Sequence, residues 1–216
     1  MTPSAVLARV RLNPYSREVQ RDLRDATQMH RTLMRLVPNG LGDSPRRAAN
    51  LLYRLDETDR ISTVVVQAST HLDPASLPPG YGHAEVRDLG PMFRALERGV
   101  AVRYRIVVNP VKQERLPLDH KGQRGKRIPL NGPEADQWWT QRAAQAGLQV
   151  HTLIPTPAMP ARSRGKNNTR MRHRLVRYDG TGLITDPRAL TQALVAGIGH
   201  AKSYGAGLLS LAPATS

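Results

Sequence analysis

The chain has no cysteine, few aromatic residues and a shortage of acids. The absence of cysteine from 216 residues excludes a disulfide framework and zinc sites built on cysteine. Aromatic residues make up 4% of the chain, so its core has to be largely aliphatic. With only 17 Asp and Glu against 32 Lys and Arg, carboxylate ligands for a two-metal nuclease are scarce.

Long apolar runs are also missing. No stretch of about 18 apolar residues occurs, so we expect no membrane-spanning helix. The first residues, MTPSAVLARVRLNP, lack the basic head and apolar stretch of a secretory signal, and we expect a cytoplasmic protein. What is abundant is positive charge: the net charge is +15 and the pI is about 11.2. This excess indicates a nucleic acid as the first candidate partner and an anionic membrane as the second.

Hydrophobic patterning in the first half predicts a strand, helices and two further strands. Ser16 and Asp25 are helix N-caps, the first for a helix from Arg17 and the second for a helix reaching towards Pro38. The runs that read as strands are 5–13, 51–56 and 61–69.

The second half repeats this kind of series. Strands are predicted over 100–110 and 148–154, and GLIT (182–185) is strand-like after a turn at Asp179-Gly180. One helix starts near Pro133 and another is capped by Asp186; the apolar GLLSLAP (207–213) closes the chain. Two βαβ-type halves indicate an α+β protein with two tandem ferredoxin-like domains. We place them at 1–95 and 96–216, with the basic RNA-binding segments in the second.

Two basic clusters lie in the second half. Between 162 and 177 there are seven Lys or Arg and no acid, and the second cluster runs from Lys112 to Arg127. A solvated surface usually mixes both signs, which favours nucleic-acid contact here. Aromatic residues are few nearby, so recognition of the backbone and shape of a duplex fits better than base stacking.

Four glycines and one lysine lie close together in GIGHAKSYGAG (197–207). Glycines beside a cation can form a phosphate cradle, and they can equally form a tight turn before a last strand. We expect RNA contacts from this loop and from the basic segments, at Arg31, Lys112, Arg162, Arg164, Lys166, Arg170, Arg172, Arg174, Gly197, Gly199, Lys202, Gly205 and Gly207.

Histidine is the remaining candidate for acid–base chemistry, because no HExxH, CxxC or Walker motif is present. His30 lies at the edge of a helical apolar stripe formed by Met29, Leu33, Leu36 and Val37. A lone histidine at such an edge serves packing more often than catalysis, and both interpretations stay open at this point.

Six segments together resemble the CasE endoribonucleases of type I-E CRISPR systems. In chain order they are RVRLNP, RDLRDATQMHRTLMRLVP, LLYRLD, VRYRIVVNPVK, TDPRALTQAL and GIGHAKSYGAGLLSLAP. The resemblance implies cleavage of precursor CRISPR RNA at the base of a repeat hairpin, without metal or cofactor. It also implies retention of the mature guide within the Cascade surveillance complex, which serves antiviral defence.

In this family the catalytic histidine falls on His30. Some members carry a tyrosine three residues earlier as a second catalytic group, whereas this chain has Thr27 there. The Thr27 hydroxyl can orient a group but accepts protons poorly, Tyr204 is a possible substitute, and Lys202 is a candidate for stabilising charge. The alternatives are a non-catalytic subunit that binds an RNA hairpin, and a basic ribosome-associated or DNA-binding protein.

Overall fold

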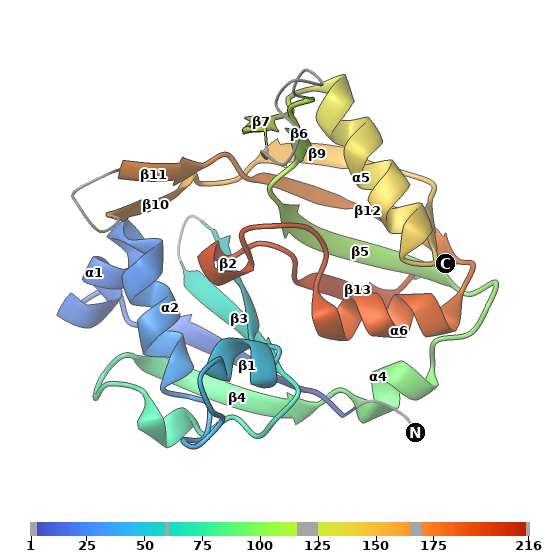
Figure 1. Cartoon of the computed structure of the whole chain (residues 1–216). Coiled ribbons are helices and arrows are strands. Elements are labelled where there is room, and N and C mark those ends of the chain that lie inside the picture. Colours follow the sequence, from blue (N-terminus) through green and yellow to red (C-terminus); the bar gives the residue numbers. More distant parts are fainter. Residues whose placement is uncertain (1–3, 59–60, 116–124, 165–169, 215–216) are drawn as a thin grey trace.

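The computed structural model describes residues 4–58, 61–115, 125–164 and 170–214. Of residues 163, 164 and 170–172 it describes the backbone alone. Figure 1 shows two sheets side by side, the first built from the N-terminal half and the second from the C-terminal half. No helix in the described part of the chain is long and apolar enough to cross a membrane.

The first sheet contains four antiparallel strands in the order β2-β3-β1-β4. These strands are β1 (Val6–Leu12), β2 (Leu52–Glu57), β3 (Ser62–Ala68) and β4 (Gly82–Asp88). The connections carry α1 (Arg17–Arg24), α2 (Ala26–Met34), α3 (Pro45–Ala48) and the 3₁₀ turn η1 (Pro74–Ser76), and α4 (Gly90–Arg94) leads out of the sheet.

The second sheet has the order β13-β5-β12-β8, with β9 also paired to β12. Its strands are β5 (Ala101–Val108), β8 (Leu148–Val150), β9 (Ile154–Pro157), β12 (Val176–Ile184) and β13 (Leu209–Pro213). The connections carry α5 (Pro133–Gln145), α6 (Pro187–Ala196) and the 3₁₀ turn η4 (Lys202–Tyr204). Two hairpins project from it: β6 (Val111–Gln113) with β7 (Arg127–Pro129), and β10 (Ala161–Arg164) with β11 (Arg170–His173).

Both strand orders are those of a ferredoxin-like domain, in which the first and third strands are central and the second and fourth lie at the edges. The predicted α+β class with two tandem ferredoxin-like domains is confirmed. The sheets lie on either side of residue 95, while the exact limits 1–95 and 96–216 as separate domains stay a prediction.

The predicted helix caps are present. The Ser16 hydroxyl accepts a hydrogen bond from the Val19 N–H at 3.4 Å, and the Asp25 carboxylate accepts one from the Thr27 N–H at 2.8 Å. Helix α2 ends at Met34, a turn earlier than the predicted run towards Pro38. The caps fix where α1 and α2 begin, and thereby which residues face the core.

The turn predicted at Asp179-Gly180 is wrong, because β12 runs unbroken through both residues. A Cβ added at Gly180 would lie only 2.0 Å from the Thr152 carbonyl oxygen. The glycine therefore serves the close approach of the segment between β8 and β9. That same segment interrupts the single strand predicted over 148–154.

The first sheet packs against the C-terminal segment on the face opposite its helices. Leu52 and Val65 form a buried cluster with Leu208. Nearby, the Gln67 amide donates to the Leu194 carbonyl at 2.7 Å, and the Arg54 guanidinium donates to the Ser210 hydroxyl at 2.8 Å. These contacts hold the last loop of the chain against the N-terminal sheet.

Candidate active site

His30 lies on α2 at the edge of a cavity of about 440 Å³. Its neighbours Met29 and Leu33 are buried in the core of the first sheet, which leaves the imidazole half-buried on the adjoining side of the helix. The residues that line the cavity are His30, Met34, Ser44, Pro45, Arg46 and Arg47. His30 thus combines attachment to a packed helix with access to an open space.

The His30 imidazole is kept uncharged at neutral pH. Burial, together with the nearby positive charge of Arg46, lowers the pKa of His30 from 6.5 to about 4. Its buried Nδ1 has no hydrogen-bond partner among the described residues. Because Nδ1 is closed off from solvent, the nitrogen that can take a proton from an incoming hydroxyl group is Nε2.

Lys202 begins η4, which contacts both α2 and β2. Its ammonium group donates to the Ala196 carbonyl at 2.7 Å. Burial and the charge of Arg46 lower the pKa of Lys202 as well. Arg46 therefore acts electrostatically on both Lys202 and His30, which brings two of the predicted catalytic residues into one neighbourhood.

The glycine loop is fixed at its two ends. Gly197, Gly199, Gly205 and Gly207 all have positive φ, between 73° and 91°. The Ile198 N–H donates to the Gly207 carbonyl at 2.9 Å, and the Gly207 N–H donates to the Val107 carbonyl at 2.7 Å. A Cβ at Gly197 would lie 2.7 Å from a Leu52 methyl carbon. These observations favour a tight packed turn at both ends.

The middle of the same loop differs from its ends. The backbone N–H groups of residues 199–203 have no hydrogen-bond partner within the described part of the chain. This stretch includes Lys202, and His200 in it is exposed. It is the part of the loop where phosphate contacts can form, and the predicted RNA contacts of the glycines stay a prediction.

A buried tyrosine, Tyr53, joins the elements that carry Thr27 and Tyr204. The Tyr53 hydroxyl is 3.3 Å from the Ala26 carbonyl on α2 and 3.2 Å from the Ser203 carbonyl in η4. Burial raises the pKa of Tyr53, which keeps this hydroxyl protonated. Tyr204 packs on His173 with ring centroids 4.7 Å apart.

The predicted RNA-binding side chains are dispersed over several elements. Arg31 and Arg162 are exposed, on α2 and β10. Lys112 forms an ion pair with Glu134 at 3.2 Å, so its charge is partly compensated, and Arg174 donates to Asn131 at 3.3 Å. Lys166 and the side chains of Arg164, Arg170 and Arg172 lie outside what the structure describes.

The β10–β11 hairpin nevertheless organises the arginine positions by its register. Arg162 is opposite Arg172, and Arg164 is opposite Arg170. In an antiparallel pair, directly opposite positions and positions two apart share a face. The backbone therefore places all four positions on one face of the hairpin.

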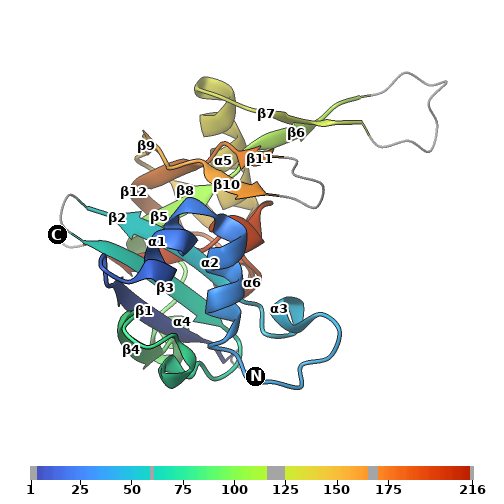
Figure 2. The same ribbon diagram turned by 90° about the vertical axis from the view of Figure 1, so that its left-hand side faces the viewer.

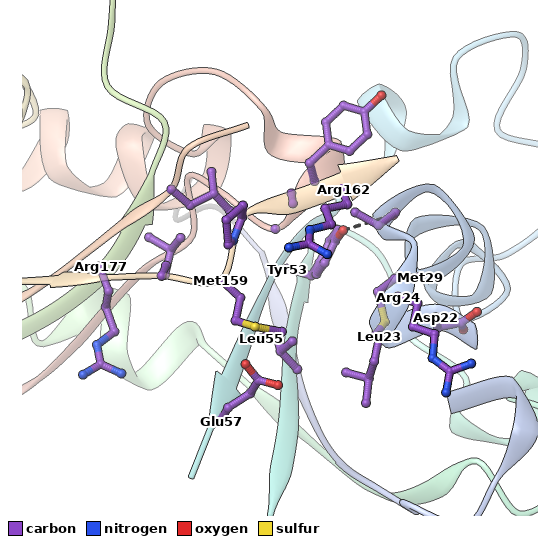
Figure 3. Close-up of a pocket in the computed structure, with 18 of the residues that line it drawn as sticks. Asp22, Leu23, Arg24, Met29, Tyr53, Leu55, Glu57, Met159, Arg162 and Arg177 are labelled. Carbon is purple, nitrogen blue, oxygen red and sulfur yellow. Dashed lines mark hydrogen bonds between the residues drawn. The ribbon is translucent and has the colours of Figure 1, made fainter. Parts of the chain in front are cut away.

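A second cavity, also of about 440 Å³, lies between the N-terminal helices and the segment leading into β10 (Figure 3). Met29 lines it, whereas the adjacent His30 faces the first cavity. Leu55 and Met159 approach one another across it, and Arg162 and Arg177 lie on the side of the second domain. In the described residues, no group of three His, Cys, Asp or Glu could hold a metal ion.

Sequence reasoning missed Arg46 and His173 as neighbours of the site. Arg46 lies in a short stretch with no motif, and only its position beside His30 distinguishes it. The His173 Nδ1 is 3.3 Å from the Asn109 side-chain nitrogen, and its buried Nε2 has no partner within the described residues. Burial and Arg127 lower the pKa of His173.

Comparison with known proteins places this chain in a family. A family model described as CRISPR associated protein matches residues 6–213. The CRISPR-associated endoribonuclease Cse3 of Thermus thermophilus is 30% identical, over 96% of this chain and 99% of that protein. The CRISPR system Cascade subunit CasE of Escherichia coli is also 30% identical, over 88% of this chain and 93% of that protein.

A solved structure of Thermus thermophilus Cse3, bound to an RNA representing a pre-cleavage complex, superposes with a TM-score of 0.79. That match is 28% identical and covers 97% of this chain and all of the solved one. The chain belongs to the CRISPR-associated CasE family, as the resemblance in its sequence indicated.

Proposed function

We propose that this protein is a metal-independent endoribonuclease that cuts precursor CRISPR RNA within the repeat, at the base of its hairpin. One observation carries the proposal: a neutral imidazole stands beside a cavity on the first domain, whose lining it shares with Arg46 and Arg47. The 30% identity to Cse3, named an endoribonuclease, supports this reaction class.

RNA brings its own nucleophile to this site. His30 takes the proton of the 2′-hydroxyl, the 2′-oxygen forms a bond to the adjacent phosphorus, and the bond to the 5′-oxygen breaks. The leaving 5′-oxygen takes a proton from solvent water and His30 later returns its proton to solvent, so the products are a 2′,3′-cyclic phosphate and a 5′-hydroxyl. Lys202 and the N–H groups of the glycine loop stabilise the additional charge on the phosphate. Thr27, one turn before His30, has a secondary role in orienting the reacting groups.

The β10–β11 hairpin holds the stem of the repeat. Its arginine positions share one face and can follow a phosphate backbone, with sequence-independent affinity from counterion release. The protein keeps its product and remains on the mature guide with the other Cascade subunits, in keeping with the relative named a Cascade subunit. Because its substrate is a fresh transcript, it acts in the cytoplasm.

Cleavage of the host's own repeat RNA in EDTA tests the proposal. The wild type should give one defined cut, and His30→Ala should lower the single-turnover rate by about 10²–10⁴-fold. His83→Ala is the matched control, because His83 is exposed on β4. If His30→Ala cuts at the wild-type rate, His30 is not the proton acceptor.

A non-catalytic RNA-binding subunit is the second candidate, favoured by Thr27 at the position where some relatives have tyrosine. It predicts tight retention of the hairpin without a cut. A general basic protein predicts no preference for the hairpin over duplex DNA at matched salt. Repeat RNA and duplex DNA assayed side by side separate all three outcomes.

A further inference from the structure

Arg46 lies in the wall of the His30 cavity, and no acidic residue in the described part of the chain lines that cavity with it. It belongs to α3, a single turn between α2 and β2 that begins at Pro45. Figure 2 shows this turn beside α2, and residues of both elements line the cavity. Within the described residues, its guanidinium makes one long hydrogen bond, 3.4 Å, to the Leu51 carbonyl. Most N–H donors of the Arg46 guanidinium are therefore available to another partner.

The charges around this cavity repel one another in the free protein. Neither Arg46 nor Lys202 forms an ion pair with a carboxylate among the described residues. The charge of Arg46 nevertheless reaches Lys202 and His30, where it disfavours their protonated forms. Like charges held together without a counter-charge are unfavourable until an anion enters between them.

The side chains that line the cavity suit a phosphodiester. Arg46, Arg47 and the Ser44 hydroxyl all border it, and His30 adds a neutral nitrogen. A guanidinium binds two phosphate oxygens in parallel, which a lysine cannot do. A phosphate seated here would supply the counter-charge that Arg46 lacks and place its ribose at the imidazole.

We propose that Arg46 is a catalytic residue of the RNA cleavage, binding the non-bridging oxygens of the scissile phosphate beside His30. This inference rests on the proposed function and adds a cation beside His30 that binds the phosphate, a role separate from proton transfer. Arg46 donates hydrogen bonds and transfers no proton: the 2′-hydroxyl proton goes to His30 and the electron pair leaves with the 5′-oxygen. Its interactions strengthen as charge develops on the phosphorane.

The test compares Arg46→Gln and Arg46→Lys with wild type under single turnover at saturating protein. Binding is measured separately on a repeat RNA with a 2′-deoxy residue at the cut, which cannot react. Arg46→Gln should cut about 10²–10³-fold more slowly and bind the deoxy analogue within about threefold of wild type. Arg46→Lys keeps the charge and loses the fork, so it should lose about tenfold.

Arg87→Gln is the matched control, because it removes an arginine exposed on β4 and should leave rate and binding unchanged. If Arg46→Gln loses less than about tenfold in rate while wild type cuts, the role of Arg46 is overturned and the proposed function stands. If wild type does not cut, both fall. Should Arg46→Gln fail to fold by circular dichroism, Arg46→Lys decides instead: the expected loss is about tenfold, and a rate within about twofold of wild type overturns the role of Arg46.

Discussion

The Tyr53 hydroxyl lies 3.2 Å from the Ser203 carbonyl oxygen, which joins the first sheet to the C-terminal glycine loop. The same hydroxyl lies 3.3 Å from the Ala26 carbonyl at the start of α2. One buried side chain of β2 thereby sets the spacing between the helix of His30 and the loop of Lys202. The site depends on contacts between residues more than a hundred positions apart.

Tyr53→Phe should therefore disturb both stability and catalysis. It removes only the hydroxyl oxygen, and with it the one O–H that the Ala26 and Ser203 carbonyls share, at a cost of about 1 kcal/mol in the free energy of unfolding. Single-turnover cleavage should fall more than RNA affinity, because the loop loses its position relative to α2. Urea unfolding and cleavage rates measure the two effects. Tyr15→Phe, at a residue that is 90% exposed, should change neither.

Gly207→Ala should destabilise the protein more than Gly40→Ala. Both glycines have positive φ, 91° and 88°, so each alanine carries a backbone strain of about 1–2 kcal/mol. A Cβ at Gly207 would also lie 2.8 Å from the Ile198 carbonyl oxygen, whereas nothing is within 4 Å at Gly40. Thermal unfolding of the two variants measures the difference. Equal losses would show that the loop shifts freely to accept the methyl group.

Acid should destabilise wild type more than His30→Gln. The pKa of His30 is about 4 in the folded protein and near 6.5 when unfolded, so between these values the unfolded state binds more protons. Stability is lost as pH falls from 6.5 to 4, by at most about 3 kcal/mol from this residue. Urea unfolding at several pH values gives the two curves. All other titrating groups are the same in wild type and His30→Gln. If the free energies of unfolding of the two proteins change in parallel with pH, His30 is not a buried neutral imidazole.

Removing the positive charges of the β10–β11 hairpin and its flanks should weaken RNA binding. The cleavage rate at saturating protein should not change. The substitutions to Gln are at Arg162, Arg164, Lys166, Arg170, Arg172 and Arg174. Each phosphate that the variant no longer neutralises should reduce the slope of log K against log salt by about 0.7–0.9. Filter binding over a salt series measures the slope, and Arg87→Gln with Arg188→Gln is the control. An unchanged slope would place the stem elsewhere on the protein.

The sequence predicted the elements whose determinants are local. Ser16, Asp25 and Asp186 were identified as caps, because a short polar side chain before a helical pattern satisfies the first N–H groups within a few residues. Strand β4 escaped notice because it is a mostly exposed edge strand without apolar alternation. Gly180 indicated a turn in the sequence. In the structure a glycine is required there because the Thr152 backbone passes close to it.

The residues of the candidate site also differ in whether local sequence or tertiary contacts reveal them. His30 was selected from its sequence, because its place at the edge of an apolar helical stripe and its family motif are both carried by neighbouring residues. Arg46 could not be selected, because an arginine in a short loop has no periodicity and its meaning comes from what lies beside it in space. The pairing of β10 with β11 could not be predicted either, because the register of two strands depends on how they meet in space.

The amino-acid order alone thus set the helix starts, the apolar faces, the basic excess and the candidate histidine, since each depends on residues within a turn or two of one another. Folding of the whole chain decided that the imidazole is neutral, that Arg46 is its neighbour, and that the glycine loop rests on the first sheet. Burial and electrostatic proximity are properties of position in space, and they exist only after distant segments have packed together.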